Sequence, residues 1–456
     1  MAEQLADSTL ESLGYKPQFK RVLKLRDLIL YGLVILTPTA PYPVYGIIEK
    51  VSLGHAALAY LVAMVAMLFT AFSYGKMSSA FPAAGSTYTY AQRSLSEHVG
   101  FIAGWSMMLD YFLIPLLSVI YSALVAARLV PQIPYIVWAI FFTVGITLIN
   151  VRGITVTARA SQFMMVILCF CSILFVILAA HWIVGKDSWT GLFVAHAILD
   201  PLTFQLRPMM LGAGIATLSY IGFDAVSTLA EDAENPKRNI PLATVSVCIV
   251  QAVFCFIQVY LAEIVWPNYH TFKDFDTAIL DISKVLGGAW MLGWITFVLL
   301  VAGLASALTG QAGASRLLFG MGRDGVIPRK IFAYVDTKYS TPTRSIYVMA
   351  AVTVVGVILL RFQLAVELLN FGAFVGFILV NISVIRHFYL RQGHRGGIGF
   401  ITNLIFPALG ALVCCYVWMS LSTPAKIVGF IWLGIGIIYL AILTKGFRKR
   451  PISLEI

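Results

Sequence analysis

The sequence predicts an all-α integral membrane protein with twelve transmembrane helices. Only 12% of its 456 residues are charged and 59% are hydrophobic, whereas ordinary soluble domains contain about 25% charged residues. Uncharged runs longer than about 18 residues, which can cross a bilayer as helices, follow one another along the chain. Two of the apolar runs are interrupted by proline or glycine, which indicates helices that are broken within the membrane.

Hydropathy divides the chain into spans, connecting segments and two tails. We expect a cytoplasmic N-terminal tail at 1–26, a transporter core at 27–390, helices 11 and 12 at 391–446 and a cytoplasmic C-terminal tail at 447–456. Within the core, helices 1–5 occupy 27–185 and helices 6–10 occupy 208–390. The twelve expected spans are 28–49, 56–80, 98–127, 134–150, 157–184, 211–231, 241–265, 285–315, 343–360, 365–388, 402–421 and 426–445.

The distribution of basic residues predicts the orientation. With both termini in the cytoplasm, 24 of the 32 Lys and Arg residues fall on the cytoplasmic side of the expected spans and 8 fall outside. This bias agrees with the positive-inside rule. The net charge of +11 therefore reflects membrane topology, and no basic face on a soluble domain suggests nucleic-acid binding.

The first span carries the clearest sign of function. Three prolines, Pro38, Pro41 and Pro43, lie within six residues at its centre. Proline lacks a backbone N–H and cannot continue a helix. Irregular backbone at membrane depth survives only where it is buried in protein or lines a cavity, and in secondary transporters such breaks form the substrate site.

The sixth span supplies a partner for this break. Residues 212–231 contain Gly212, Gly214 and Gly222 together with the acidic residue Asp224. Glycine in a membrane helix also serves helix packing, so packing is the alternative interpretation. Spans one and six correspond to each other in two five-span halves, which is the pattern of an inverted repeat.

Two carboxylates lie at membrane depth. A charged group at the bilayer centre costs at least about 2.5 kcal/mol on insertion scales, so we expect Asp110 and Asp224 to face protein or water. Either is a candidate for binding a proton or a substrate ammonium group. Asp110 could instead pair with a cation or a helix end, and Asp224 could cap the broken helix.

The sequence does not indicate a metal site, a cofactor or an enzyme. The six cysteines lie within apolar spans and no His or acidic residues recur with zinc-like spacing, so we expect neither a metal site nor a cofactor. The seven histidines lie near span ends or in loops, which argues against an intramembrane enzyme. Glu231 and Arg323 lie on the expected cytoplasmic side, where they are either solvated or form a cytoplasmic gate.

Three segments resemble those of amino acid–polyamine–organocation (APC) transporters. They read SYIGFDAVSTLAEDAENPKRNIPLA at 219–243, FPAAGSTYTYAQRSLSEHVGFIAGW at 81–105 and SRLLFGMGRDGVIP at 315–328. Two further segments, 69–92 and 368–384, look most like the bacterial putrescine importers of this superfamily. The resemblance implies a LeuT-like fold: a five-plus-five inverted repeat with helices 1 and 6 broken, followed by two extra C-terminal helices.

The resemblance also implies a substrate held on the unwound backbone of spans one and six. On this basis the candidate substrate-binding residues are Thr39, Ala40, Pro41, Tyr42, Tyr111, Ser219, Tyr220, Gly222 and Phe223. The first break has proline and alanine where many members have glycine, so it offers fewer N–H donors to a substrate carboxylate. Span five lacks the lysine with which some members replace the coupling ion.

We therefore expect a secondary transporter in the plasma (inner) membrane that moves an amino acid or polyamine by alternating access. Proton-coupled symport is the expected mechanism, with H+ preferred over Na+ as the coupling ion. An amino-acid/amine exchanger and a transporter-like solute sensor are the alternatives. The lipid bilayer and the small-molecule substrate are the expected partners, and the sequence gives no indication of oligomeric state.

Overall fold

The fold is a bundle of long helices. The computed structural model describes residues 23–448 except 83–85, 153, 231–232, 324, 326, 337–338 and 340. No strand occurs among these residues, and only an isolated parallel bridge joins Leu23 to Ala233. The principal helices are α2 (Leu25–Leu36), α3 (Tyr45–Ser52), α4 (Ala56–Ala80), α5 (Ser86–Ser94), α6 (Glu97–Leu129), α7 (Tyr135–Val151), α8 (Ile154–Asp187), α9 (Leu206–Ala216), α10 (Pro236–Val265), α11 (Ala278–Arg323), α12 (Arg329–Phe332), α13 (Thr343–Leu359), α14 (Phe362–Val384), α15 (Ile398–Phe400), α16 (Phe406–Ser420) and α17 (Thr423–Leu443).

Short 3₁₀ and π helices complete the described elements. The 3₁₀ helices are η1 (Trp189–Leu192), η2 (Ala195–Ala197), η3 (Thr217–Tyr220), η4 (Phe223–Leu229), η5 (Tyr269–Thr271) and η6 (Phe275–Thr277). The π helices are η7 (Ile385–Arg391), which extends α14, and η8 (Ile401–Ile405), which leads into α16.

The described residues include nine helices that are long and apolar enough to cross a membrane. They are accompanied by two shorter apolar helices, α7 and α13, and by the pair α2 and α3. The prediction of an apolar all-helical chain is thus confirmed. The exact twelve-span arrangement stays a prediction, because α2, α3, α7 and α13 are each shorter than the nine long helices.

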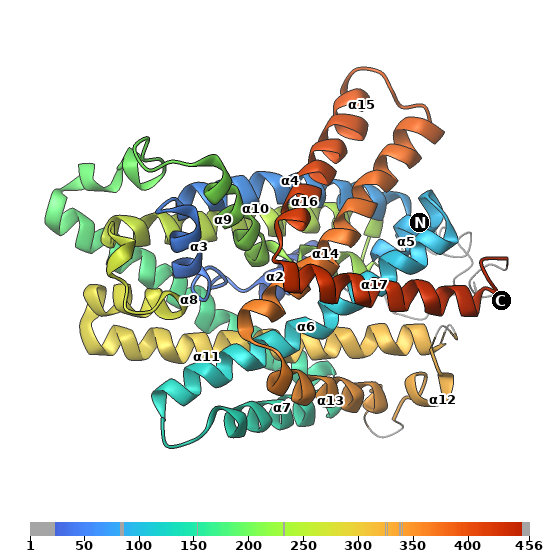
Figure 1. The fold of residues 1–456 in the computed structure, drawn as a ribbon, viewed down its shortest axis with the longest axis horizontal. Coiled ribbons are helices and arrows are strands. Elements are labelled where there is room, and N and C mark those ends of the chain that lie inside the picture. The colour runs from blue at the N-terminus through green and yellow to red at the C-terminus, as the bar shows by residue number, and fades with distance from the viewer. Residues whose placement is uncertain are drawn as a thin grey trace.

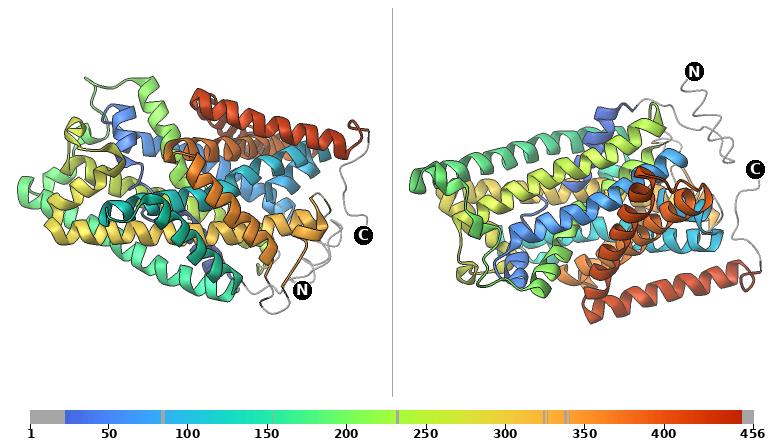
Figure 2. Two further views of the ribbon diagram at one scale, coloured as in Figure 1. Left: turned by 60° about the horizontal axis from the view of Figure 1, so that its bottom comes forward. Right: turned by 90° about the horizontal axis from the view of Figure 1, so that it is seen from above.

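The helices differ in how deeply they are buried. In an apolar 18-residue stretch of 206–229, 78% of the residues are buried, whereas the shares in the corresponding stretches that contain α16 and α17 are 22% and 17%. Figure 2 shows α17, in red, along one edge of the bundle. The centre is formed by α4 packed on α10, and by α6 packed on α11 and α14. The last two helices are therefore peripheral to the part of the fold that holds the breaks.

The ends of the bundle carry different elements. In Figure 1, α3 and the loops around η1 and η5 lie at the left end, and α5, α12 and the C-terminal end of α17 lie at the right end. We call these the α3 end and the α5 end. The long helix α11 has non-helical dihedral angles at Gly287 and Gly288, so its first turns form a separate piece at the α3 end.

Candidate functional site

The first break consists of residues 37–44, between α2 and α3. Thr37 has a positive φ of 58°, and the three prolines prevent regular helical bonding. The backbone instead makes tight turns: Ala40 N donates to Thr37 O at 3.1 Å, and Val44 N donates to Pro41 O at 3.2 Å. The break predicted from the prolines is thus present.

The second break lies between η3 and η4, at Ile221 and Gly222. Gly222 has a φ of 124°, and a Cβ atom there would lie 2.7 Å from Ile35 Cγ2 on α2. Glycine is needed on both counts, since other residues disfavour this dihedral angle and a side chain would collide with α2. The second break consequently lies directly against the end of α2, which leads into the first break.

Two glutamines of α10 hold the opened backbone. Gln251 Nε2 donates to Thr37 O at 2.9 Å and to Ser219 O at 3.2 Å, so one amide group bridges both breaks. Gln258 Nε2 donates to Pro38 O at 2.9 Å. These bonds satisfy carbonyl groups that have lost their helical partners, which would otherwise be costly at membrane depth.

A cavity of about 130 Å³ lies against the two breaks. Its other walls come from α6, α11 and α14, and none of its lining residues is charged. The hydroxyl-bearing residues of the lining are Thr37, Thr39, Ser118, Tyr121, Ser219 and Ser306. The buried Thr39 Oγ1 has no hydrogen-bond partner. The cavity therefore offers a small solute a mainly apolar surface, hydroxyl groups and at least one free acceptor.

The predicted substrate-binding residues divide into two groups. Thr39, Ala40 and Ser219 line the cavity, whereas the lining does not include Pro41, Tyr42, Tyr111, Tyr220, Gly222 or Phe223. The difference arises because most of the second group faces the protein core. Their direct role in binding stays a prediction.

The large aromatic residues of the second group pack against neighbouring helices. The Tyr42 ring lies 5.4 Å from the Phe175 ring of α8, and Phe223 stacks on Phe377 of α14, also at 5.4 Å. The Tyr220 side chain is fully buried and donates to a carbonyl of α4. These residues support the walls of the site.

Asp110 and Asp224 form a buried pair on the α5 side of the cavity. Asp110 lies one turn before the cavity-lining residue Ile114 on α6, and Asp224 begins η4 just after the second break. The side chains are 1% and 2% exposed, and each has one oxygen without a hydrogen-bond partner. Their carboxyl groups are close enough to interact with each other and with Tyr111. The structure thus brings together the two acids that the sequence indicated.

The α5 end is closed by contacts between the start of α2 and the segment after the second break. Glu234 N donates to Leu23 O at 2.9 Å, next to the bridge between Leu23 and Ala233. The beginning of the first broken helix is thus attached to the end of the second.

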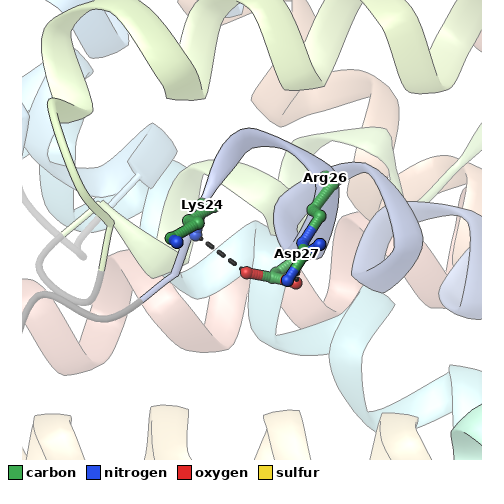
Figure 3. Close-up of polar contacts among 3 residues, drawn as sticks. All are labelled: Lys24, Arg26 and Asp27. Carbon is green, nitrogen blue, oxygen red and sulfur yellow. Dashed lines mark hydrogen bonds and ion pairs between the residues drawn. The ribbon is translucent and has the colours of Figure 1, made fainter.

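The first turn of α2 is capped beside this closure (Figure 3). Lys24 N donates to Asp27 Oδ2 at 2.9 Å, and Arg26 Nε lies 3.5 Å from Asp27 Oδ1. The side chains of Arg26 and Asp27 are 80% and 36% exposed, so this ion pair contributes little to stability. The predicted gate of Glu231 and Arg323 lies outside the side chains that the structure describes.

Sequence reasoning missed several groups of the site. Gln251 and Gln258 are seven residues apart in the apolar stretch 247–262 of α10, a spacing that places them on one helix face. Ser118 and Ser306 also lie at membrane depth and line the cavity. The sequence signal that could have identified the two glutamines is the recurrence of a polar residue at helical spacing within an apolar span.

Comparison with known proteins agrees with this architecture. The Amino acid permease family matches residues 44–446. The low-affinity putrescine importer PlaP of Escherichia coli K12 is 33% identical over 95% of both chains. The methylthioribose transporter of Bacillus subtilis is 26% identical over 94% of both chains. The branched-chain amino acid permease BcaP of Lactococcus lactis is 26% identical over 94% of this chain and 96% of its own.

These relatives are transporters and none is an enzyme, which confirms the expectation that this chain is not an enzyme. The family match covers most of the chain, and the apolar helices agree with a multi-pass membrane protein. The chain belongs to the amino acid permease family of the APC superfamily of transporters.

Proposed function

We propose that this protein is a secondary active transporter that imports a small amine by alternating access, with H+ as the coupling ion. The observation that carries the proposal is the cavity where the two broken helices meet, with Asp110 and Asp224 on one side of it. Discontinuous helices supply free backbone groups to a substrate at the membrane midplane.

A diamine suits the chemistry of this site better than an amino acid. The cavity lining contains no Lys or Arg to pair with a substrate carboxylate, and three prolines reduce the number of N–H donors in the first break. Buried carboxylates and carbonyl oxygens are the natural partners of an ammonium group. The putrescine importer among the relatives supports the same substrate class.

The orientation follows from the basic residues. The α5 end faces the cytoplasm in this proposal, because the positive-inside rule places both termini there. The protein resides in the inner membrane, with the LeuT-like five-plus-five core followed by two peripheral helices. In the structure the α5 end is closed by the contact between Leu23 and Glu234.

A branched-chain amino acid is the second candidate substrate. The apolar part of the lining, which includes Ile35, Leu117 and Leu299, would accept an aliphatic side chain, and one relative is a branched-chain amino acid permease. Exchange of an amino acid for an amine is a variant of this alternative. A solute sensor would bind the same ligands without transporting them.

The test is uptake by purified protein in liposomes. With an inward proton gradient, labelled putrescine should accumulate above its external concentration, and a protonophore should abolish the accumulation. Leucine and methylthioribose serve as competitors and as alternative labelled substrates. Accumulation of leucine without putrescine would overturn the diamine assignment, a response to Na+ alone would overturn proton coupling, and binding without flux would identify a sensor.

A further inference from the structure

A second pair of buried carboxyl groups lies at the opposite end of the bundle. Glu49 is near the end of α3 and Glu263 is near the end of α10, and their side chains are 2% and 6% exposed. The two carboxyl groups are close enough to interact electrostatically. Glu263 Oε2 accepts a hydrogen bond from Ala57 N at 3.1 Å, at the start of α4. This pair is at the α3 end, away from Asp110 and Asp224.

The pair lacks both a counter-ion and a full set of hydrogen bonds. Glu263 Oε1 is buried without a hydrogen-bond partner, and the Tyr45 hydroxyl group is the polar group that lies against the Glu49 carboxyl group. Tyr45 is only 1% exposed and lies near both carboxyl groups. Among the described residues, neither carboxyl group has a Lys, Arg or His nitrogen within 4.0 Å.

The neighbouring titratable groups are engaged elsewhere. Lys50 Nζ lies over the Phe275 ring at 4.9 Å. The ring nitrogens of His55 contact Ser52 O at 3.0 Å and the backbone of Asp200 at 3.3 Å. Tyr269 lies close enough to interact with Glu49. The other charged or titratable groups at this end are at least partly exposed to solvent: His181, Lys186, Asp187, His196, Asp200, Arg207, Tyr260, His270, Lys273, Asp274, Asp276, Asp281 and Lys284.

Binding of a single proton would lower the electrostatic cost of burying Glu49 and Glu263 together. Two ionised carboxylates that leave water without a counter-ion carry a large desolvation penalty, and their mutual repulsion adds to it. Protonation of one carboxyl group removes that repulsion. It also provides an O–H that can donate to the unpartnered oxygen of the other carboxyl group. The closed arrangement therefore favours a pair that shares one proton.

The segment 266–277 covers this pair from the α3 end. Trp266 stacks on Phe272 at 5.3 Å, and Phe272 meets the edge of Tyr45 at 6.2 Å. Gly46 packs so closely against the Phe275 carbonyl that a side chain there would collide with it. Displacement of the segment would expose the carboxyl groups to water, where both can ionise.

We propose that Glu49 and Glu263 form a proton-binding site whose occupancy closes the segment 266–277 over the α3 end of the transporter. One proton passes from water to a carboxylate as the segment closes, and returns to water as it opens. Acidic medium on that side therefore favours the closed state. The inference rests on the proposed function only for naming this side as the exterior.

The experiment is hydrogen–deuterium exchange of the full-length protein in lipid nanodiscs, without substrate. Protection factors, which correct for the intrinsic pH dependence of exchange, are compared at several pH values for segment 266–277. In the wild type we expect protection to fall at least tenfold between acidic and alkaline medium. In E49Q and E263Q, which cannot form two adjacent negative charges, protection should stay high across the range.

The matched control is Asp276→Asn, which removes an exposed carboxylate of the same segment and should keep the wild-type pH dependence. The infrared carbonyl band of a buried protonated carboxyl group provides a second measurement, and E49Q and E263Q should each alter it. Protection that does not depend on pH in the wild type, or that depends on it equally in E49Q and E263Q, would overturn the proposal. Because neither readout requires transport, failure of the proposed function leaves this test intact.

Discussion

The two buried carboxyl pairs occupy different surroundings on either side of the cavity. Asp110 and Asp224 lie within one turn of cavity-lining residues and next to tyrosine side chains. Glu49 and Glu263 lie beneath a covering segment at the α3 end. The first pair lies beside the cavity without lining it, whereas the second lies next to the segment 266–277. Similar chemistry in the two places thus suggests substrate binding in one and control of access in the other.

The largest expected effect is a loss of putrescine affinity, which should distinguish the Asp110–Asp224 pair from the Glu49–Glu263 pair. Asp110→Asn removes a charged partner of the substrate ammonium, and a hydrogen bond to a charged group is worth about 1.5–3 kcal/mol. Putrescine affinity should therefore fall by roughly 10- to 150-fold. Glu263→Gln, measured in the same liposome assay, should retain near-normal affinity. Equal losses of affinity in the two variants would remove the distinction between the pairs.

The next effect concerns the backbone that positions Asp224. Gly222→Ala introduces a side chain at a φ of 124° and places its Cβ against Ile35. Strain of this kind costs on the order of 1–3 kcal/mol, so the variant should unfold at a lower temperature and transport poorly. Gly145→Ala on α7, where a Cβ meets no atom within 4 Å, is the control. A thermal shift assay with putrescine present and absent measures both stability and binding.

The sequence indicated Asp110 and Asp224 as separate candidates and predicted the two breaks, for a clear physical reason. Proline interrupts a helix wherever it lies in a span, and an acid such as Asp110 in the middle of a span must avoid lipid. Glu49 gave no such signal, because it lies at the end of the expected span 28–49, beside Lys50. Its burial depends on how the segment 266–277 folds over it, which local sequence does not specify.

The hydrogen bonds from α10 to the two breaks could likewise not be predicted from the sequence. A glutamine in an apolar span can face several neighbours, and only the packing of α10 against both breaks directs Gln251 toward Thr37 and Ser219. Which residues line the cavity also depends on packing that local sequence does not specify. Tyr42 and Phe223 are adjacent to the breaks in sequence, yet helix rotation points them into the core.

Gln251→Leu should have a smaller effect than the change at Gly222. It leaves the Ser219 carbonyl group without its donor and removes one of the two donors of Thr37 O, which keeps its bond from Ala40 N. An unsatisfied buried group costs about 1–3 kcal/mol. Gln258→Leu frees only Pro38 O within the break, so it should destabilise the protein less. Thermal unfolding of both variants in detergent measures the difference. A larger loss for Gln258→Leu would show that the bridge between the breaks is not the stronger support.

The smallest expected effect concerns the α5 end, where the contact between Leu23 and Glu234 corresponds to the segment 266–277 at the α3 end. Arg26→Ala removes an exposed ion pair worth about 0–1 kcal/mol, so stability and uptake should stay near wild type. Asp27→Ala also removes the acceptor of Lys24 N at 2.9 Å, and loss of a helix cap costs about 0.5–2 kcal/mol. It should therefore loosen the start of α2, and exchange at Glu234 N, which donates to Leu23 O, should rise above that in Arg26→Ala. If the two variants exchange alike, the cap does not contribute to closure, and the α5 end depends on the contact between Leu23 and Glu234 alone.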